Sequence, residues 1–333
     1  MSKKQLNIAV VGWFHHFNAG DDRIGEVLIK TLAPHNVVLI SNYNVHLLNS
    51  FDLLIFTAGF WHPRHSISRN FKAWYKNIKV PYMAVGLGVE KTDDLQCQKS
   101  YNYFVENAVF LMVRDIESCE ALGGSDKIII GPDITWFDPL PICKDFNTEG
   151  DVLLNLRPYN KSKSIIQNFT KLNFLENPKF YSLSKEDKAL GLRLGFKEEN
   201  IIEFFNFRTL HNVKLIYGMR FHSSVFSQQQ AIPHYNIVYH QKVSSLVSDV
   251  KSFINKSNEF ATINSINDFT KVVDEELLKI ERKQLLENRE QIILGAKSVK
   301  NIFLKKLEKI PKNNYKSSLK YKMINKIISL GHL

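Results

Sequence analysis

Short runs of apolar residues recur along this chain, and stretches with helical periodicity separate many of them. The first 90 residues hold four such runs, at 6–12, 36–41, 51–59 and 80–88. Each run is continuously apolar and rich in leucine and β-branched residues, which is typical of strands that helices cover on both faces. The sequence therefore predicts an α/β fold built on a parallel sheet.

The pattern is interrupted once and then starts again. Residues 138–150 carry no periodicity, and a new apolar run begins at residue 151. A chain of 333 residues is also long enough for two domains. We therefore expect two Rossmann-like lobes that face a cleft and resemble the two-lobed GT-B architecture: residues 1–140 on the acceptor side and residues 150–296 with the donor and anion site. Their ligands are expected at the carboxyl ends of the strands. Further strands of the second lobe are predicted near residues 179–184, 200–205, 213–220 and 234–240.

The C-terminal part is helical and basic. Residues 268–307 have an amphipathic pattern that predicts two or more helices in succession. The formal net charge of +11 is concentrated late in the chain, so residues 297–333 are set apart as a basic helical tail. Two interpretations of this tail stay open: a solvated helix with a loose end, or a segment that binds an anionic membrane surface.

Other bulk properties exclude several classes of protein. No apolar run approaches the roughly 18 residues that span a bilayer, and the first residues have a strand pattern instead of a signal peptide. Three cysteines, Cys97, Cys119 and Cys143, suggest neither a disulfide framework nor a zinc site. We therefore expect a cytoplasmic protein that binds no metal and no nucleic acid.

The loop after the first predicted strand carries Asn18, Gly20, Asp21 and Asp22 before a helix expected to start near Arg23. Neither a dinucleotide fingerprint nor a Walker phosphate loop is present. One carboxylate is explained by a cap at the helix start. The second is available to accept a proton from a sugar hydroxyl, and Asp21 is the candidate base.

A stronger signal lies at residues 218–226, where a predicted strand ends and a helix begins. The free amides and the dipole of a helix start stabilise an anion, and Ser223 or Ser224 is expected to cap this helix. Arg220 adds a planar charged fork suited to carboxylate or phosphate. His222 is expected on the same side and can donate a proton near neutral pH.

Three other charged positions follow predicted strands. Arg157 follows the first strand of the second lobe and is either an anion ligand or part of an interlobe salt bridge. Arg114 and Asp115 form the kind of pair that fixes a strand-to-helix turn, so no chemistry is assigned to them. Residues 131–133 are interpreted in the same way, as a turn after a buried strand.

In this order and spacing, the segments resemble the polysaccharide pyruvyl transferase family over residues 6–250. Ala231 departs from the pattern, because the family often has glycine before this proline, and residues 58–60 lack a common double glycine. Three groups carry the resemblance: N-x-G-D-[DE] at Asn18, Gly20, Asp21 and Asp22; R-D-x-x-S and P-D at Arg114, Asp115, Ser118, Pro132 and Asp133; and R-x-H, x-P and Y-x-x-K at Arg220, His222, Pro233, Tyr239 and Lys242.

The resemblance implies an enzyme that moves pyruvate from phosphoenolpyruvate to a pair of sugar hydroxyls as a ketal, without cofactor or metal. His222 would be the acid and Asp21 the base. The implied partners are phosphoenolpyruvate and a glycan or lipid-linked glycan, with a peripheral place on the inner face of the membrane. Two alternatives remain: a nucleotide-sugar glycosyltransferase of the same fold, and a nonenzymatic protein that binds membrane or nucleic acid through its tail. Substrate contacts are assigned to Arg220, Arg157, Ser223, Asn18, Gly20, Asp22 and Lys242.

Overall fold

The chain forms two compact units in a computed structural model that describes residues 5–41, 44–57, 60–61, 77–158, 178–203, 210–237, 262–263 and 275–311. Unit 1 contains Met1–His16, Asp21–Phe137 and Ala296–Leu333, and unit 2 contains Phe17–Gly20 and Asp138–Gly295. The short segment Phe17–Gly20 is therefore grouped with unit 2, although its chain neighbours on both sides are grouped with unit 1.

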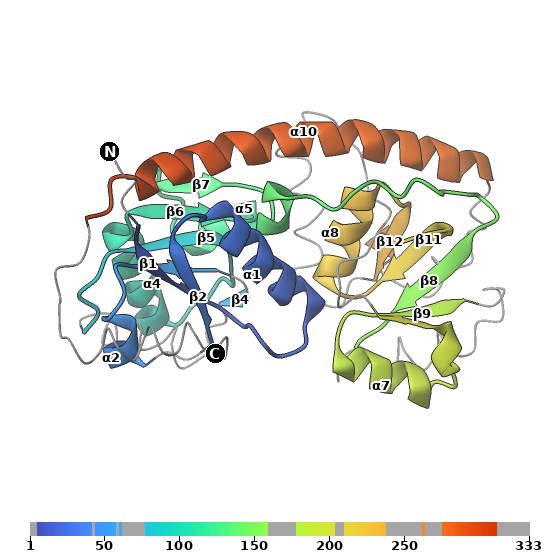
Figure 1. Cartoon of the computed structure of the whole chain (residues 1–333), viewed down its shortest axis with the longest axis horizontal. Helices are drawn as coiled ribbons and strands as arrows, with labels where there is room; N and C mark the ends of the chain where they lie inside the picture. The colour runs from blue at the N-terminus through green and yellow to red at the C-terminus, as the bar shows by residue number, and fades with distance from the viewer. Residues whose placement is uncertain are drawn as a thin grey trace. The chain divides into compact units, whose positions relative to one another are not determined.

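Unit 1 is built on a parallel sheet with the strand order β2-β1-β3-β5-β6-β7, and β4 pairs with β5 beside this path. Figure 1 shows these elements with the helices that connect them. The strands are β1 (Asn7–Val11), β2 (Asn36–Ile40), β3 (Leu53–Phe56), β4 (Phe60–Trp61), β5 (Tyr82–Val89), β6 (Phe110–Val113) and β7 (Ile128–Ile130). The helices are α1 (Ala19–Thr31), α2 (Val45–Leu48), α4 (Leu95–Asn107) and α5 (Ile116–Ala121), with the 3-10 turn η1 (Ile134–Phe137).

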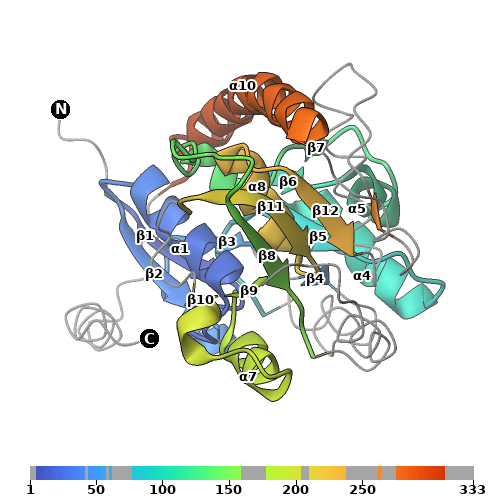
Figure 2. The same cartoon turned by 90° about the vertical axis from the view of Figure 1, so that its right-hand side faces the viewer.

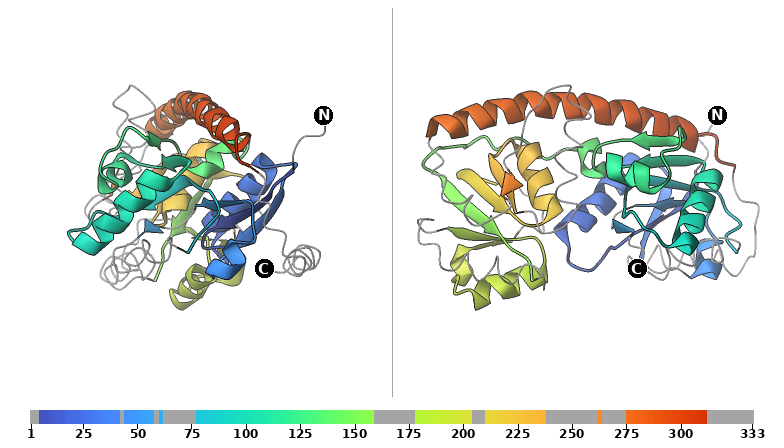
Figure 3. Two further views of the ribbon diagram at one scale, coloured as in Figure 1. Left: turned by 90° about the vertical axis from the view of Figure 1, so that its left-hand side faces the viewer. Right: turned by 180° about the vertical axis from the view of Figure 1, so that it is seen from behind.

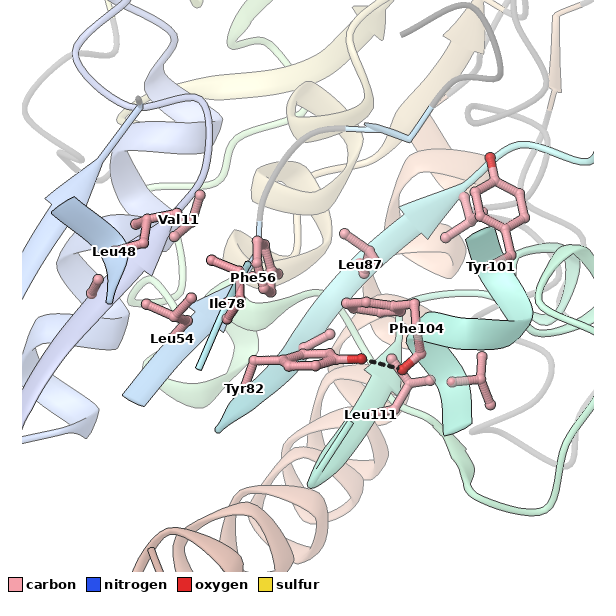
Figure 4. Close-up of a cluster of buried hydrophobic side chains, with 14 of the residues drawn as sticks. Val11, Leu48, Leu54, Phe56, Ile78, Tyr82, Leu87, Tyr101, Phe104 and Leu111 are labelled. Carbon is pink, nitrogen blue, oxygen red and sulfur yellow. Dashed lines mark hydrogen bonds between the residues drawn. The ribbon is translucent and has the colours of Figure 1, made fainter. Parts of the chain in front are cut away.

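Both faces of this sheet are buried. Val11 of β1 and Leu54 and Phe56 of β3 belong to one apolar cluster, which also takes Tyr101 and Phe104 from α4. Figure 4 shows this cluster, with the Tyr82 hydroxyl donating to the Phe104 carbonyl at 2.7 Å. The intervening strand residues Ile8, Val10, Leu53 and Ile55 are just as buried, so the opposite face is covered as well. Covered faces explain why the strand sequences are continuously apolar.

Unit 2 has a second parallel sheet, with the strand order β10-β9-β8-β11-β12-β13. Figure 2 shows β8, β11 and β12 side by side. Its strands are β8 (Asp151–Asn155), β9 (Lys179–Ser182), β10 (Ile201–Glu203), β11 (Val213–Gly218), β12 (His234–Ile237) and β13 (Thr262–Ile263). Its helices are α7 (Lys185–Arg193) and α8 (Phe221–Gln230), with the 3-10 turn η3 (Glu198–Asn200).

The strand orders place a topological switch point in each sheet. In unit 2 the chain runs outward from β8 to β9 and β10, then returns to β11 on the other side of β8. In unit 1 the equivalent reversal lies between β1 and β3. The loops that leave neighbouring strands here diverge to opposite faces, and ligands of open α/β sheets bind in the resulting crevice. Two Rossmann-like sheets, as predicted, therefore each offer one ligand-binding edge.

The C-terminal helix α10 (Glu275–Leu307) is one continuous helix of 33 residues, visible in Figure 3. For the described part of residues 268–307, the prediction of two or more helices in succession is wrong, because no proline interrupts α10 and an apolar stripe continues through it. Val299, Phe303 and Leu307 are buried, so the segment set apart at Lys297 begins inside a packed helix. Residues 312–333 lie outside the described residues. Within the described part, no helix has the length and apolar composition needed to cross a bilayer.

Candidate functional site

Two charged residues predicted for the second lobe, Arg157 and Arg220, lie at the switch point of unit 2. Arg157 lies two residues beyond the end of β8, and Arg220 lies two residues beyond the end of β11. Because β8 and β11 are paired neighbours, both loops leave the same edge of the sheet. The backbone N–H of Arg157 donates to the sulfur of Met219 at 3.5 Å, which joins the two loops directly.

The guanidinium of Arg220 is held by a buried carboxylate that the sequence did not single out. Its Nε donates to Oδ2 of Asp187 at 2.5 Å, and its Nη2 donates to Oδ1 at 2.7 Å. Nη2 also donates to the hydroxyl of Ser184 at 2.6 Å. Asp187 is 0% exposed, so the pair is a two-pronged ion pair largely removed from water. One edge of the predicted anion fork is therefore occupied by the protein itself.

Asn155 completes the support of Arg220. Its side-chain oxygen accepts from the Arg220 backbone N–H at 2.9 Å, and its amide nitrogen donates to the Tyr181 carbonyl at 2.8 Å. Asn155 is the last residue of β8, so the strand itself fixes where the β11 loop begins. A polar side chain ending an apolar run was visible in the sequence, but its partner was not.

Ser184 and Asp187 carry a local sequence signal. They form the S-x-x-D pattern of a helix N-terminus, and Ser184 is the N-cap of α7, accepting from the Asp187 N–H at 3.2 Å. The Asp187 carboxylate also accepts from the Leu183 N–H at 3.2 Å. The pattern therefore indicates a cap, whereas the ion pair with Arg220 depends on a contact between residues 33 positions apart.

His222 lies directly against the segment that carries Asn18 and Gly20. A Cβ atom added to Gly20 would lie 1.9 Å from Nδ1 of His222, so only glycine fits beneath this imidazole. The segment is tied to the β9–α7 loop, because the Ala19 N–H donates to the Leu183 carbonyl at 2.9 Å and Asn18 forms a β-bridge with Ser184. The structure thus brings Asn18 and Gly20 together with Arg220 and His222, although at least 200 positions separate the two pairs in sequence.

The cap expected for α8 is wrong. The N-cap of α8 is Arg220, which makes no side-chain cap hydrogen bond. The buried hydroxyl of Ser223 instead donates to the Arg220 carbonyl at 2.6 Å, and that of Ser224 donates to Asn236. Both serine side chains pack toward the sheet of unit 2 and away from the start of the helix. Gly218 has no side chain and so leaves room for Ser223. The role of Ser223 in substrate binding stays a prediction.

Asp21 and Asp22 lie in unit 1, within the first turn of α1. The helix begins at Ala19 and not near Arg23, because the Asn18 side chain accepts from the Gly20 N–H at 3.2 Å and starts the helix earlier. Asp21 is buried. Asp22 accepts from the His15 N–H at 3.3 Å, and burial raises the pKa of its carboxyl.

The residues that the sequence predicts to have structural roles do have these roles in the structure. Asp115 caps α5 by accepting from the Ser118 N–H at 2.5 Å and contacts Arg114 Nε at 3.4 Å. Asp133 accepts from the backbone and hydroxyl of Thr135 and so shapes the turn after β7. Tyr239 and Lys242 lie outside the described residues.

Comparison with known proteins identifies the family. A family model for polysaccharide pyruvyl transferases matches residues 18–241, more than half of the chain. The chain belongs to the polysaccharide pyruvyl transferase family. It is therefore a transferase, and the family implies a glycan acceptor. A comparison with curated protein sequences gave no match.

Solved structures agree on the fold of this pyruvyl transferase family member. A putative UDP-N-acetylglucosamine 2-epimerase from Listeria monocytogenes is 11% identical with a TM-score of 0.51, and the match covers 93% of this chain and 99% of that one. The glycotransferase of kitacinnamycin is 9% identical with a TM-score of 0.50, over 92% and 100% of the two chains. At these identities the likeness bears on the fold alone, the two-lobed GT-B type that the sequence predicted.

Proposed function

We propose that this protein transfers pyruvate from phosphoenolpyruvate to two hydroxyls of a glycan, which forms a cyclic ketal and releases phosphate. The observation that carries the proposal is the contact between His222 and Gly20, which joins the R-x-H and N-x-G-D segments at the switch point of unit 2. An imidazole beside a helix N-terminus and an arginine suits a reaction that needs both an acid and anion contacts.

The reaction requires two proton movements. The methylene carbon of phosphoenolpyruvate gains one proton and becomes the methyl group, while one acceptor hydroxyl attacks the neighbouring carbon. Phosphate leaves as the second hydroxyl attacks the same carbon. The two hydroxyls lose two protons in total: one balances the proton gained by carbon, and the other ends on phosphate. No electrons are exchanged, so the reaction needs no redox cofactor, and the proposal assigns no metal to it.

Residue roles follow from this chemistry. We assign the proton donor to His222 and the base that accepts the hydroxyl proton to Asp21. Arg157 and Arg220 contact the carboxylate or phosphate of the donor, and preorganised positive charge stabilises the departing phosphate. Because Asp187 holds the Nε and Nη2 edge of Arg220, the guanidinium is fixed in orientation before the donor arrives. The remaining substrate contacts are assigned to Asn18, Gly20, Asp22, Ser223 and Lys242.

The location of the reaction is part of the proposal. A lipid-linked glycan at the cytoplasmic face of the membrane is an acceptor that suits the basic segment from Lys312 to Lys326. The protein would then act as a cytoplasmic enzyme with peripheral membrane attachment and no nucleic-acid partner.

Product analysis tests the proposal. The purified protein is incubated with phosphoenolpyruvate and a panel of glycans, and both phosphate release and the pyruvate ketal are followed by NMR and mass spectrometry. We expect ketal and phosphate in equal amounts. His222→Ala should lower kcat by about 10² to 10⁴-fold with little change in donor affinity, because proton transfer contributes in that range. Transfer of a sugar from a nucleotide sugar, with phosphoenolpyruvate unused, would contradict the proposal.

A further inference from the structure

The loop after β1 exposes an unusual set of aromatic and imidazole side chains. Trp13 is 50% exposed, and His15 and His16 are exposed as well. The rings of Trp13 and His16 are stacked, with centroids 3.7 Å apart and an angle of 17° between their planes. One face of the indole is therefore covered by the imidazole. Tryptophan is enriched at interfaces because its ring offers an apolar face together with a polar N–H, so this exposed indole is a candidate binding surface.

The exposure of Trp13 is supported by buried contacts on both sides of it. Phe14 is fully buried, and its backbone is fixed by Ser41, whose hydroxyl accepts from the Phe14 N–H at 3.0 Å and donates to the Phe14 carbonyl at 2.8 Å. Gly12 leaves the space that the Phe14 ring fills, since a Cβ there would lie 2.8 Å from it. The loop is thus anchored through Phe14 while Trp13 points away from the core.

The backbone next to the indole has a conformation that costs free energy. His15 has a φ of 64°, in the left-handed region that non-glycine residues rarely adopt. The His15 N–H donates to Asp22 Oδ1 at 3.3 Å, which holds the strained residue in place. Strained residues that the surrounding structure retains cluster at sites of function.

The position in the sheet independently points to a ligand. This loop follows β1, and β1 and β3 flank the switch point of unit 1. Thr57 follows β3 at the same edge, is 2% exposed, and its hydroxyl has no hydrogen-bond partner among the described residues. The Thr57 N–H donates to the Val11 carbonyl at 3.0 Å, so the two strand ends are joined here.

We propose that Trp13 and Asp22 form a subsite for one pyranose ring of the glycan acceptor. The C–H face of the ring stacks on the open face of the indole, and ring hydroxyls donate to the Asp22 carboxylate. A nucleotide base also stacks on indole, but the carboxylate repels the phosphates that a nucleotide carries, which favours a neutral polyhydroxylated ligand. The assignment of this sugar as the acceptor rests on the proposed function, whereas its binding does not.

The environment of Asp22 agrees with a ligand that donates hydrogen bonds. Burial raises the pKa of this carboxyl, although the His15 N–H and the nearby His15 and His16 side chains act in the opposite direction. The ionised form is therefore short of hydration. A sugar hydroxyl that donates to the carboxylate would replace part of the lost water.

The test separates binding from catalysis. Saturation-transfer NMR without donor measures binding of methyl glycosides of the common hexopyranoses to wild type, Trp13→Ala, Trp13→Phe and the control Leu95→Ala, which removes another exposed apolar side chain of unit 1. We expect Trp13→Ala to weaken binding by about tenfold, Trp13→Phe to retain most of it, and the control to match wild type. Uridine diphosphate, whose phosphates the Asp22 carboxylate repels, should show no binding that depends on Trp13.

Steady-state kinetics then tests the acceptor assignment. With phosphoenolpyruvate and the best acceptor, Trp13→Ala should raise the acceptor KM by about tenfold and leave the donor KM unchanged. Unchanged glycoside binding in Trp13→Ala, or binding of uridine diphosphate that depends on Trp13, would overturn the subsite. Binding that depends on Trp13 in a protein that forms no ketal would instead count against the proposed function and leave the subsite standing.

Discussion

At the scale of single residues, the site depends on a glycine that has no room for a side chain. The imidazole of His222 occupies the position where a Cβ of Gly20 would lie, so the two residues are complementary in shape. The N-x-G-D motif therefore has a packing reason for its glycine at this position. This contact predicts that a methyl group added at Gly20 will move the side chain of His222, which is distant in sequence.

Gly20→Ala should displace His222 without unfolding the protein. The added methyl group forces the imidazole away, and misplacement of about 1 Å at a reacting group can cost about 10²-fold in rate, so kcat should fall by roughly that factor. The measurement is a double-mutant cycle with His222→Ala. If the glycine acts through His222, the double variant will be no slower than His222→Ala alone. Independent, additive losses would contradict this explanation.

The pair of Arg220 and Asp187 also makes a prediction about stability. Asp187→Asn keeps the shape of the side chain but removes the negative charge that faces the guanidinium, in a site with little exposure to water. Removing one partner of a buried pair costs about 3 to 5 kcal/mol, so we expect the free energy of unfolding to fall by that amount. Urea denaturation measures it. Glu198→Gln on an exposed ion pair with Lys188 is the matched control and should leave the midpoint unchanged.

At the scale of elements, the end of α8 explains one departure from the family pattern. Ala231 is the C-cap of this helix and has left-handed backbone angles, φ 54° and ψ 44°. A Cβ is unfavourable in this conformation, and glycine is the residue that ends helices in this way most often. The glycine often found here in the family therefore has a conformational reason.

Ala231→Gly should stabilise the protein despite removing a methyl group. Relief of the left-handed strain, about 1 to 2 kcal/mol, exceeds the added chain entropy of glycine in the unfolded state, so a net gain of about 0.5 to 1 kcal/mol is expected. Thermal and urea denaturation check it. Ala189→Gly, within α7, is the matched control and should be destabilising. A loss of stability in Ala231→Gly would mean that packing of the methyl group dominates.

The helices and strands differ in how well the sequence predicts them. Strands such as β1, β5 and β11 were predictable because both of their faces are buried and their residues are continuously apolar. The length of α10 was not predictable. The boundary between the two units falls within this helix, and its pattern of exposed and buried residues continues across that boundary. Arg220 and His222 were found from their place after a strand, whereas Asp187 was missed because its ion pair joins distant parts of the chain.

At the scale of the whole molecule, the two units share one organisation. Unit 2 has the strand order of a Rossmann fold, unit 1 has the flavodoxin-like order extended by further strands, and each has its switch point next to its first strand. The predicted site residues divide between them, with Asp21 and Asp22 in unit 1 and Arg220 and His222 in unit 2. The proposed function accordingly assigns the donor contacts and the acid to unit 2, and the base and the acceptor subsite to unit 1.

The basic segment beyond the described residues should bind an anionic membrane surface. Lys312 to Lys326 contains five lysines with apolar residues between them. Each lysine contributes roughly 1 kcal/mol near an anionic surface, while the apolar side chains enter the headgroup region. We therefore expect the full chain to sediment with anionic vesicles but not with neutral ones, and less so at high salt.

Truncation after Pro311 tests whether this segment is the anchor. The cut leaves α10 complete and keeps Ile310, which is buried, so the described fold should be unaffected. Binding to anionic vesicles should be lost, while kcat on a short soluble acceptor stays the same because no assigned site residue is removed. A truncated protein that still sediments with anionic vesicles would place the membrane contact elsewhere in the chain, and one that loses activity on the soluble acceptor would give residues 312–333 a part in the reaction.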